Sequence, residues 1–236
     1  MAVTVLAVGG GSLLLSRAQE RTFVTPIGGH TIVTLSDGTS IELNTDTVVR
    51  ATMNGAQRSA VLEKGEAYFR VKHDPAHPFK VAVGSRQITV LGTKFTVRKD
   101  RDAVRVALIE GRVQFATTSA AQTPGAAPQS TVLKPGDVLL ATATSLIVTH
   151  ETKPDLANAL GWRRGVLVFD HTSLADVARE YNRYNAQQIV IADSVTARLS
   201  MSGTMPTNDI AEFTSIARTV FGLRVRNKGG DVVISR

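Results

Sequence analysis

The 236-residue chain contains no cysteine and few aromatic residues, and its charges are not clustered. Without cysteine it has no disulfide, no thiolate nucleophile and no Cys-ligated zinc. Aromatic residues make up 5% of the chain, and no run of five like charges occurs although the net charge is +7. A nucleic-acid surface needs clustered basic residues interleaved with aromatics. The charge pattern therefore indicates a solvated basic surface, and we expect no nucleic-acid partner.

The familiar catalytic and cofactor-binding motifs are missing as well. The sequence has no G-x-S-x-G nucleophile elbow, no P-loop and no dinucleotide fingerprint. His73 and His77 have the spacing of a zinc-binding helix, but Pro75 lies between them and excludes a helix. We therefore expect no metal, no cofactor and no multiple-turnover enzyme.

The N-terminus carries an uncharged apolar run from Ala2 to Ser16. As a helix this run extends about 22 Å, which is short of the roughly 30 Å hydrocarbon core of a bilayer. No Lys or Arg precedes it, which is unusual for a signal peptide. We interpret residues 1–20 as the distal part of a membrane-spanning helix whose beginning is missing. A degenerate signal peptide and a buried soluble segment are the alternatives.

Residues 21–150 show the alternating pattern of β-strands. Thr31 to Leu35 and Thr39 to Leu43 flank the turn signal Ser36-Asp37-Gly38, which predicts a hairpin. Further period-2 segments follow, and none of them has a sustained helical period. The pattern predicts a mainly β domain, built as a sandwich or as a solenoid-like stack.

The pattern changes after residue 160. Residues 151–160 are predicted to be a linker. Residues 161–236 then read as a small α+β module of β-α-β-β-α-β-β order. In this module Ser173 or the preceding threonine caps a first amphipathic helix, and a second helix spans about residues 208–221.

One dipeptide has a chemistry of its own. Gly92-Thr93 lies between two β segments, where a strained bond can break by attack of the threonine hydroxyl on the glycine carbonyl. The alternative is an ordinary glycine at a bulge or tight turn, and the spacing by itself favours this structural role. Gly92 and Thr93 are therefore candidates for a single-turnover self-cleavage.

Several short blocks, taken in order, resemble the signature of one known family. The blocks follow the patterns L-x-D-G-S-x-V-x-L-N and R-x-V-x-L-x-G-E-A-x-F-x-V, and then continue with shorter motifs. They are Leu35-Ser36-Asp37-Gly38-Thr39, Glu42-Leu43-Asn44, Arg58, Leu62 to Val71, Pro78-Phe79-Lys80-Val81, Leu91-Gly92-Thr93-Lys94-Phe95, Glu110-Gly111-Arg112-Val113, Gly136, Trp162-Arg163-Arg164-Gly165 and Glu180-Tyr181-Asn182-Arg183-Tyr184. Their shared order from Thr25 to Arg236 makes the chain resemble the FecR-like anti-sigma factors.

The resemblance implies a single-pass inner-membrane regulator with the bulk of this chain in the periplasm. Such proteins receive a signal from the signalling domain of a TonB-dependent outer-membrane transporter. They relay it to an extracytoplasmic-function sigma factor through a cytoplasmic domain, which is absent from these 236 residues. Some members cleave themselves at the Gly-Thr of the Leu-Gly-Thr block, which strengthens the candidacy of Gly92 and Thr93.

The resemblance also implies where a partner binds. Residues 161–236 are similar to the small secretin/TonB short N-terminal fold, and we expect the transporter-binding surface within them, at an open sheet edge. The alternative function is an envelope-anchored β module that binds a glycan or another cell-wall polymer. That alternative needs exposed aromatic residues, and the chain has one Trp and three Tyr.

Overall fold

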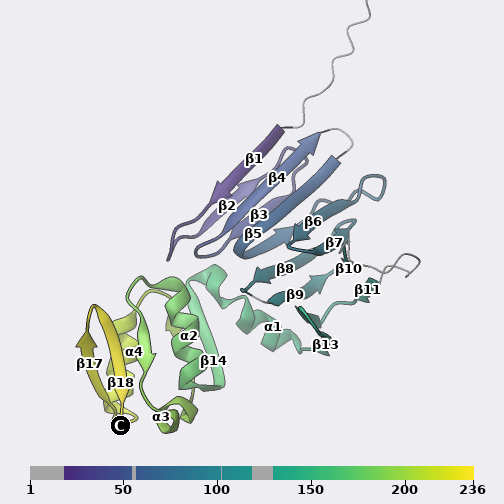
Figure 1. Cartoon of the computed structure of the whole chain (residues 1–236). Helices are drawn as coiled ribbons and strands as arrows, with labels where there is room; N and C mark the ends of the chain where they lie inside the picture. Colours follow the sequence, from purple (N-terminus) through teal and green to yellow (C-terminus); the bar gives the residue numbers. More distant parts are fainter. Residues whose placement is uncertain (1–18, 55–56, 102, 119–129) are drawn as a thin grey trace, which may run out of the picture.

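The computed structural model describes residues 19–54, 57–101, 103–118 and 130–236. The predicted membrane segment lies outside these residues, except that Gln19 and Glu20 belong to the first strand. Among the described helices none is long and apolar enough to cross a membrane. The chain forms a β-rich domain followed by a smaller α+β module (Figure 1).

The β-rich domain contains thirteen hydrogen-bonded strands in one curled sheet. One half has the order β1-β4-β5-β6-β7-β10-β11, and the other has the order β2-β3-β5-β8-β9-β12-β13. The strands are β1 (Gln19–Val24), β2 (Thr31–Thr34), β3 (Ser40–Leu43), β4 (Val48–Asn54), β5 (Gln57–Arg70), β6 (Phe79–Val83), β7 (Arg86–Val90), β8 (Lys94–Lys99), β9 (Ala103–Glu110), β10 (Val113–Thr117), β11 (Ser130–Leu133), β12 (Asp137–Thr142) and β13 (Leu146–His150). The prediction of a mainly β domain is confirmed.

The long strand β5 belongs to both halves of the sheet. Its first residues pair with β4 and β6, and its last residues pair with β3 and β8. Gly65 lies between the two parts with φ +86°, a conformation that side-chain-bearing residues rarely adopt. A Cβ atom at this position would lie 2.6 Å from the Asp46 carbonyl oxygen. Gly65 therefore lets the chain pass from one half to the other.

The core of the domain lies between the two halves. Alternating side chains from both halves point into it, as the period-2 pattern predicts. Phe69 and Phe95 stack with ring centroids 5.1 Å apart, and Phe79 from the other half lies 6.4 Å from Phe69. The hairpin turn is tied to β5 by an ion pair between the buried Arg58 and the partly buried Asp37, with 2.8 Å between Nη2 and Oδ2.

The segment predicted as a linker contains a helix. Residues Lys153–Ala159 form α1, whose first turn is closed by a capping box between Thr152 and Asp155. Leu156 of this helix packs against Ala107 and Val138 on the outer face of the sheet. The connection between the two parts of the chain is therefore fixed to the β-rich domain and is not an extended tether.

The module contains η1 (Gly161–Arg164), β14 (Val166–Ser173), α2 (Leu174–Tyr184), β15 (Ile189–Ile191), α3 (Ser194–Arg198), β16 (Ser200–Pro206), α4 (Ile210–Thr219), β17 (Arg224–Lys228) and β18 (Asp231–Ser235). Strands β14 and β16 form an antiparallel pair, and β15-β18-β17 form a mixed sheet. The order differs from the predicted one by the short helix α3, which separates β15 from β16. Asp193 caps α3, and a helix of five residues is too short to show a helical period in the sequence.

The first predicted helix agrees closely with α2. Ser173 is its N-cap and accepts a hydrogen bond from the backbone N–H of Asp176. Leu174, Val177 and Tyr181 point inward and are fully buried. Tyr181 stacks on Phe213 of α4 with centroids 5.4 Å apart, so both helices share one core.

Candidate functional site at the domain joint

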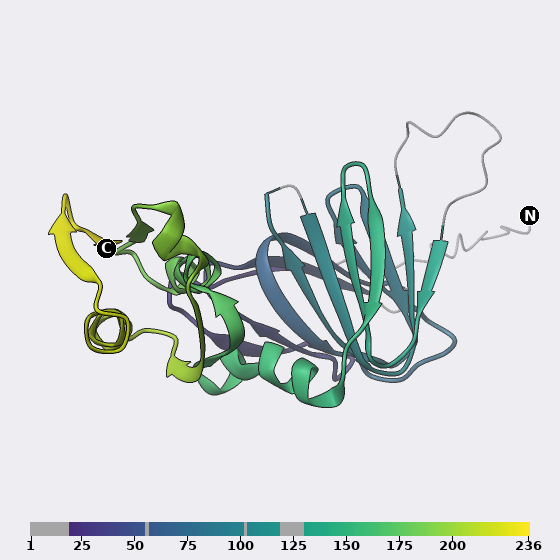
Figure 2. The same cartoon turned by 90° about the horizontal axis from the view of Figure 1, so that it is seen from below.

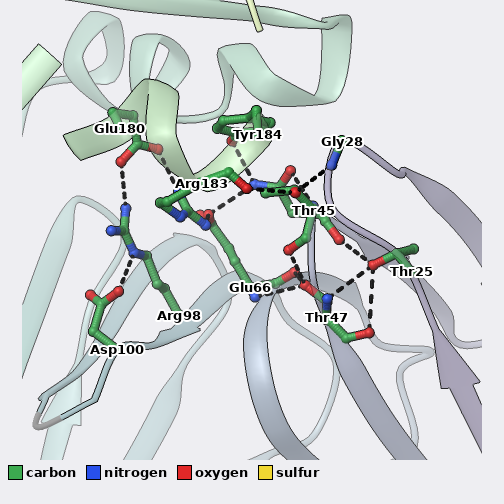
Figure 3. A network of polar contacts seen from close by, with 11 residues as sticks. Thr25, Gly28, Thr45, Thr47, Glu66, Arg98, Asp100, Glu180, Arg183 and Tyr184 are labelled. Atoms are coloured by element: carbon green, nitrogen blue, oxygen red, sulfur yellow. Dashed lines mark hydrogen bonds and ion pairs between the residues drawn. The ribbon is translucent and has the colours of Figure 1, made fainter. Parts of the chain in front are cut away.

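The two domains meet through a set of polar and aromatic side chains, which we call the domain joint. From the β-rich domain it includes Glu42, Asn44, Thr45, Glu66, Tyr68 and Arg98, and from the module it includes Trp162, Arg163, Glu180, Arg183 and Tyr184. Figure 3 shows the part around Arg183. Both views of the whole chain place α2 beside the end of the curled sheet (Figures 1 and 2).

Strand alternation explains why polar residues of the β-rich domain face the module. On β5, Ala67 and Phe69 belong to the core, so Glu66 and Tyr68 point to the outer face. On β3, Glu42 lies between two core residues and points outward as well. These side chains are nevertheless buried, with Glu66 at 7% and Glu42 at 5% exposure. The module covers them.

Arg183 is the central cation of the joint. Its Nη2 lies 2.7 Å from Oε2 of Glu66, and its Nη1 pairs with Glu180 on the same helix. Glu180 in turn contacts Arg98 of β8, with 3.0 Å between Oε2 and Nη1. Two arginines and two glutamates therefore alternate across the joint, and each domain contributes one of each sign.

Burial and charge act on these groups in opposite directions. Burial by itself would raise the pKa of Glu180, but the charges of Arg183 and Arg98 outweigh it and hold the pKa below its ordinary value. The pKa of Arg183 is raised, since Glu66 and Glu180 more than offset burial. Glu180 and Arg183 are therefore both ionised at neutral pH, and the charge of each is stabilised by its partners.

A hydrogen-bonded layer lies beside the charged groups. Asn44 Nδ2 donates to Oε2 of Glu66 at 2.9 Å and to the hydroxyl of Tyr184 at 2.8 Å. Thr45 Oγ1 donates to the Arg183 carbonyl oxygen at 2.9 Å, and it accepts from the backbone N–H of Gly28 at 2.8 Å. Burial raises the pKa of Tyr184, so its hydroxyl stays protonated. The C-terminal end of α2 is thus held by both side-chain and backbone contacts.

A second cluster forms around Glu42. Its Oε2 lies 2.7 Å from Nε of Arg163, and its Oε1 lies 2.8 Å from Nε2 of His30. The Arg163 guanidinium lies over the Tyr68 ring, 3.9 Å from the centroid, which is a cation–π contact. Trp162 is buried beside it and meets the His30 ring edge-on at 5.8 Å. Residues of η1 are therefore fixed to the β-rich domain.

The joint is built from the sequence blocks that carry the family resemblance. Its residues come from the Glu42-Leu43-Asn44 block, from the Leu62 to Val71 block, from Trp162-Arg163 and from Glu180 to Tyr184. Reasoning from the sequence treated the blocks as separate markers and missed that they meet. One sequence feature could have indicated the joint: two of the blocks carry a glutamate, Glu42 or Glu66, at a strand position that points away from the core.

The candidate cleavage dipeptide lies outside the joint, in the turn between β7 and β8. Thr93 is buried, and its Oγ1 donates a hydrogen bond to the Arg112 carbonyl oxygen at 3.0 Å. Gly92 is not among the glycines with a positive φ. Gly92 is needed for space, since a Cβ atom there would lie 2.5 Å from Nδ1 of His73.

A second glycine approaches the same bond. Gly111 has φ +93°, and a Cβ atom on it would lie 2.9 Å from both the Gly92 carbonyl oxygen and Thr93 Oγ1. The structure therefore brings together three segments that are separate in the sequence, with His73, Gly92-Thr93 and Gly111 close to one another. The imidazole ring of His73 lies next to the bond, and the sequence analysis did not predict this position.

Comparisons with known proteins agree with this architecture. The model of the family described as "FecR protein" matches residues 21–114. Two structures of a candidate anti-sigma factor from Parabacteroides distasonis ATCC 8503 share the fold, each with a TM-score of 0.72 and 24% sequence identity. The alignments cover 92% and 91% of this chain, and 99% and 98% of theirs. No curated protein gives a significant match.

The matched residues include most strands of both halves of the curled sheet and the β-rich side of the joint. The likeness to the solved structures extends over the module as well, which shows that the combination of a curled sheet and a small α+β module is a shared fold. Residues 21–114 are therefore a FecR domain, and the remaining residues complete a fold that this chain shares with the two solved structures.

Proposed function

We propose that this chain is the extracytoplasmic part of an anti-sigma factor. In this role it receives a signal from the signalling domain of a TonB-dependent outer-membrane transporter and relays it across the inner membrane to an extracytoplasmic-function sigma factor. The FecR domain supports the anti-sigma role. The fold it shares with a candidate anti-sigma factor is consistent with it.

The observation that carries the proposal is the domain joint. The residues of the family signature from both domains contact one another there, and two cross-domain ion pairs fix α2 to β5 and β8. To relay a signal, the module that receives it and the FecR domain must respond together. Because the joint links them by charges and by hydrogen bonds, a partner that binds the module also acts on the FecR domain.

The glycan-binding alternative lacks the surface that it requires. Binding sites for sugars commonly use exposed aromatic platforms. The one Trp and the three Tyr of the chain are all buried, and none of the eight Phe is exposed. The structure describes the positions of all of them. We therefore favour protein recognition.

A binding experiment tests the proposal. The purified chain is titrated by calorimetry with the signalling domains of the TonB-dependent transporters of the same organism, one at a time. We expect one domain to bind saturably with a 1:1 stoichiometry, and the others to bind much more weakly. A glycan array serves as the comparison. Binding to the array without binding to any signalling domain would contradict the proposal.

We also propose that the FecR domain cleaves itself once, between Gly92 and Thr93. Thr93 Oγ1 attacks the Gly92 carbonyl carbon, the C–N bond breaks, and the hydroxyl proton passes to the new amine of Thr93. Water then hydrolyses the ester, giving a Gly92 carboxylate and a free Thr93 hydroxyl. The close packing of His73 and Gly111 around the bond supports this proposal. Strands on the two sides of the break pair with each other, β5 with β8 and β7 with β10, so the two fragments stay together.

Self-cleavage predicts two fragments on a denaturing gel, with masses that place the break at Gly92/Thr93. Thr93→Ala removes the nucleophile and should abolish cleavage, whereas Thr93→Ser keeps a hydroxyl and should slow it. Gly222→Ala, in the α+β module and with open space around the new Cβ atom, is the control and should leave cleavage unchanged. Cleavage that persists in Thr93→Ala would assign it to a contaminating protease.

A further inference from the structure

The last strands of the module form a sheet whose outer strand is open. In the part of the chain that the structure describes, β17 pairs with β18 and with no other strand. Figures 1 and 2 place it on the side of the module away from the curled sheet. An open edge presents unpaired backbone N–H and C=O groups, which can pair with an added strand.

The side chains of this strand carry a regular charge pattern. Arg224, Arg226 and Lys228 occupy alternate positions, so they lie on the same face of the sheet, and all three are exposed. Among the described residues none of them has a carboxylate within 4.0 Å. Val225 lies between them and packs against the module core. The cations are therefore not used by the fold.

The neighbouring strand offers a carboxylate to only one of these three cations. Arg224 and Arg226 face Ser235 and Val233 on β18. Lys228 faces Asp231, whose Oδ1 accepts a hydrogen bond from the backbone N–H of Gln188 at 3.1 Å. Beyond β18, Val190 of β15 is 44% exposed opposite Val233. The outer face thus combines a row of free cations with a small apolar strip.

A strand added beside β17 would place its own side chains directly opposite these cations. Residues opposite each other in adjacent strands have Cβ atoms about 4.5–5.5 Å apart, and opposite charges at such positions attract. Since the cations recur at every second residue, complementary carboxylates must recur at every second residue too. A membrane surface would not require either this spacing or an open backbone.

We propose that β17 receives an extended segment of a partner protein that carries Asp or Glu at three alternate positions. The segment adds a fourth strand to the sheet, and its carboxylates pair with Arg224, Arg226 and Lys228. This inference rests on the proposed function in that the partner is the transporter signalling domain. It goes further by naming the surface and the chemistry of the segment that binds.

Nuclear magnetic resonance on the isotope-labelled chain tests the site directly. The probe is a seven-residue peptide, Thr-Glu-Val-Glu-Val-Glu-Thr, blocked at both ends and titrated at low salt. We expect shifts concentrated at residues 224–228 and weaker binding as salt rises. A peptide of the same composition with its three Glu adjacent should bind at least tenfold more weakly. Equal affinity of the two peptides, or shifts that avoid β17, would overturn the proposal.

Charge reversal supplies the matched comparison. The triple variant Arg224→Glu, Arg226→Glu, Lys228→Glu should lose at least tenfold in affinity for the peptide and for the transporter domain. The control Arg164→Glu, Arg198→Glu, Arg218→Glu changes the net charge equally at exposed positions of the same module and should keep both affinities. Thermal melting of both variants verifies that the module is folded.

The outcomes separate the two proposals. If a transporter domain binds the chain and the triple variant binds it equally well, the assignment to β17 is wrong and the proposed function stands. If the peptide binds at β17 but no transporter domain binds the chain, the proposed function is wrong and the assignment of β17 as a strand-binding edge stands. Phosphatidylglycerol vesicles are the third probe. If the chain binds the vesicles but not the peptide, and the triple variant no longer binds the vesicles, then β17 contacts a lipid surface and the proposed added strand is wrong.

Discussion

Replacing Arg183 with methionine is expected to lower the free energy of unfolding by about 3 kcal/mol. Methionine keeps the apolar stem of the side chain but removes the charge between Glu66 and Glu180. Glu66 then remains at 7% exposure without its cation, and an unpaired buried charge is costly. Urea unfolding followed by circular dichroism measures the change.

Arg179→Met is the matched control on the same helix, one turn earlier. Its side chain is 72% exposed, and its partner Asp176 is exposed too. Exposed pairs contribute about 0–1 kcal/mol, so this variant should change stability by no more than that. Equal losses in Arg183→Met and Arg179→Met would mean that the joint contributes little. Combining Arg183→Met with Glu66→Gln should recover part of the loss, because the unpaired carboxylate is removed with its partner.

The same variant separates binding from relay. Arg183 belongs to the joint, whereas β17 lies on the opposite side of the module. Under conditions where Arg183→Met is folded, we expect the acidic peptide to bind it with unchanged affinity. A sigma-dependent reporter should nevertheless respond less to the inducing signal, since the module holds the FecR domain less firmly without the ion pair of Arg183 and Glu66. A normal reporter response in Arg183→Met would show that the Arg183 contacts of the joint are not needed for signal transfer.

Replacing Gly65 with alanine is expected to destabilise the FecR domain by about 2–4 kcal/mol. Two costs add at this position. Its φ of +86° is unfavourable for any residue with a side chain. The new Cβ atom would also lie 2.6 Å from the Asp46 carbonyl oxygen and from Thr47 Cα. Both contacts are with backbone atoms, so the strand β5 would have to shift.

Gly84→Ala measures the cost of a positive φ without the steric clash of the new Cβ atom. Gly84 has φ +56° in the turn between β6 and β7, and a Cβ atom there meets no atom within 4 Å. We expect a loss of about 1 kcal/mol for this variant. The difference between the two variants, measured by urea unfolding, isolates the steric cost at the crossing point of β5. If both lose the same amount, β5 tolerates a side chain at its bend.

Local pattern in the sequence predicted the elements of this fold well. Alternation of apolar residues predicted the strands, and the Ser36-Asp37-Gly38 turn predicted the first hairpin, which is β2 and β3. The capping residue Ser173 and the inward spacing of Leu174, Val177 and Tyr181 predicted α2. Short-range chemistry decides each of these features, so one stretch of sequence was sufficient to predict them.

The arrangement of the domains depended on long-range contacts. From alternation, Glu66 and Tyr68 face away from the core of β5, where solvent is the ordinary neighbour. The ion pair of Glu66 with Arg183 spans 117 residues, and no local pattern encodes it. For the same reason residues 151–160 read as a linker, because the buried contact of Leu156 lies on a distant strand.

Composition and local pattern were sufficient to predict a mainly β chain with a small α+β module, to exclude cysteine chemistry, and to reveal the resemblance to the FecR-like proteins. The tertiary structure decided that the signature blocks form one joint, that Gly92 is required for space next to His73, and that Arg224, Arg226 and Lys228 form a free row on an open edge. The physical reason is the range of the interactions. Strand alternation and helix capping act over a few residues, whereas the pairing of buried charges and the exposure of an edge are fixed when distant segments pack.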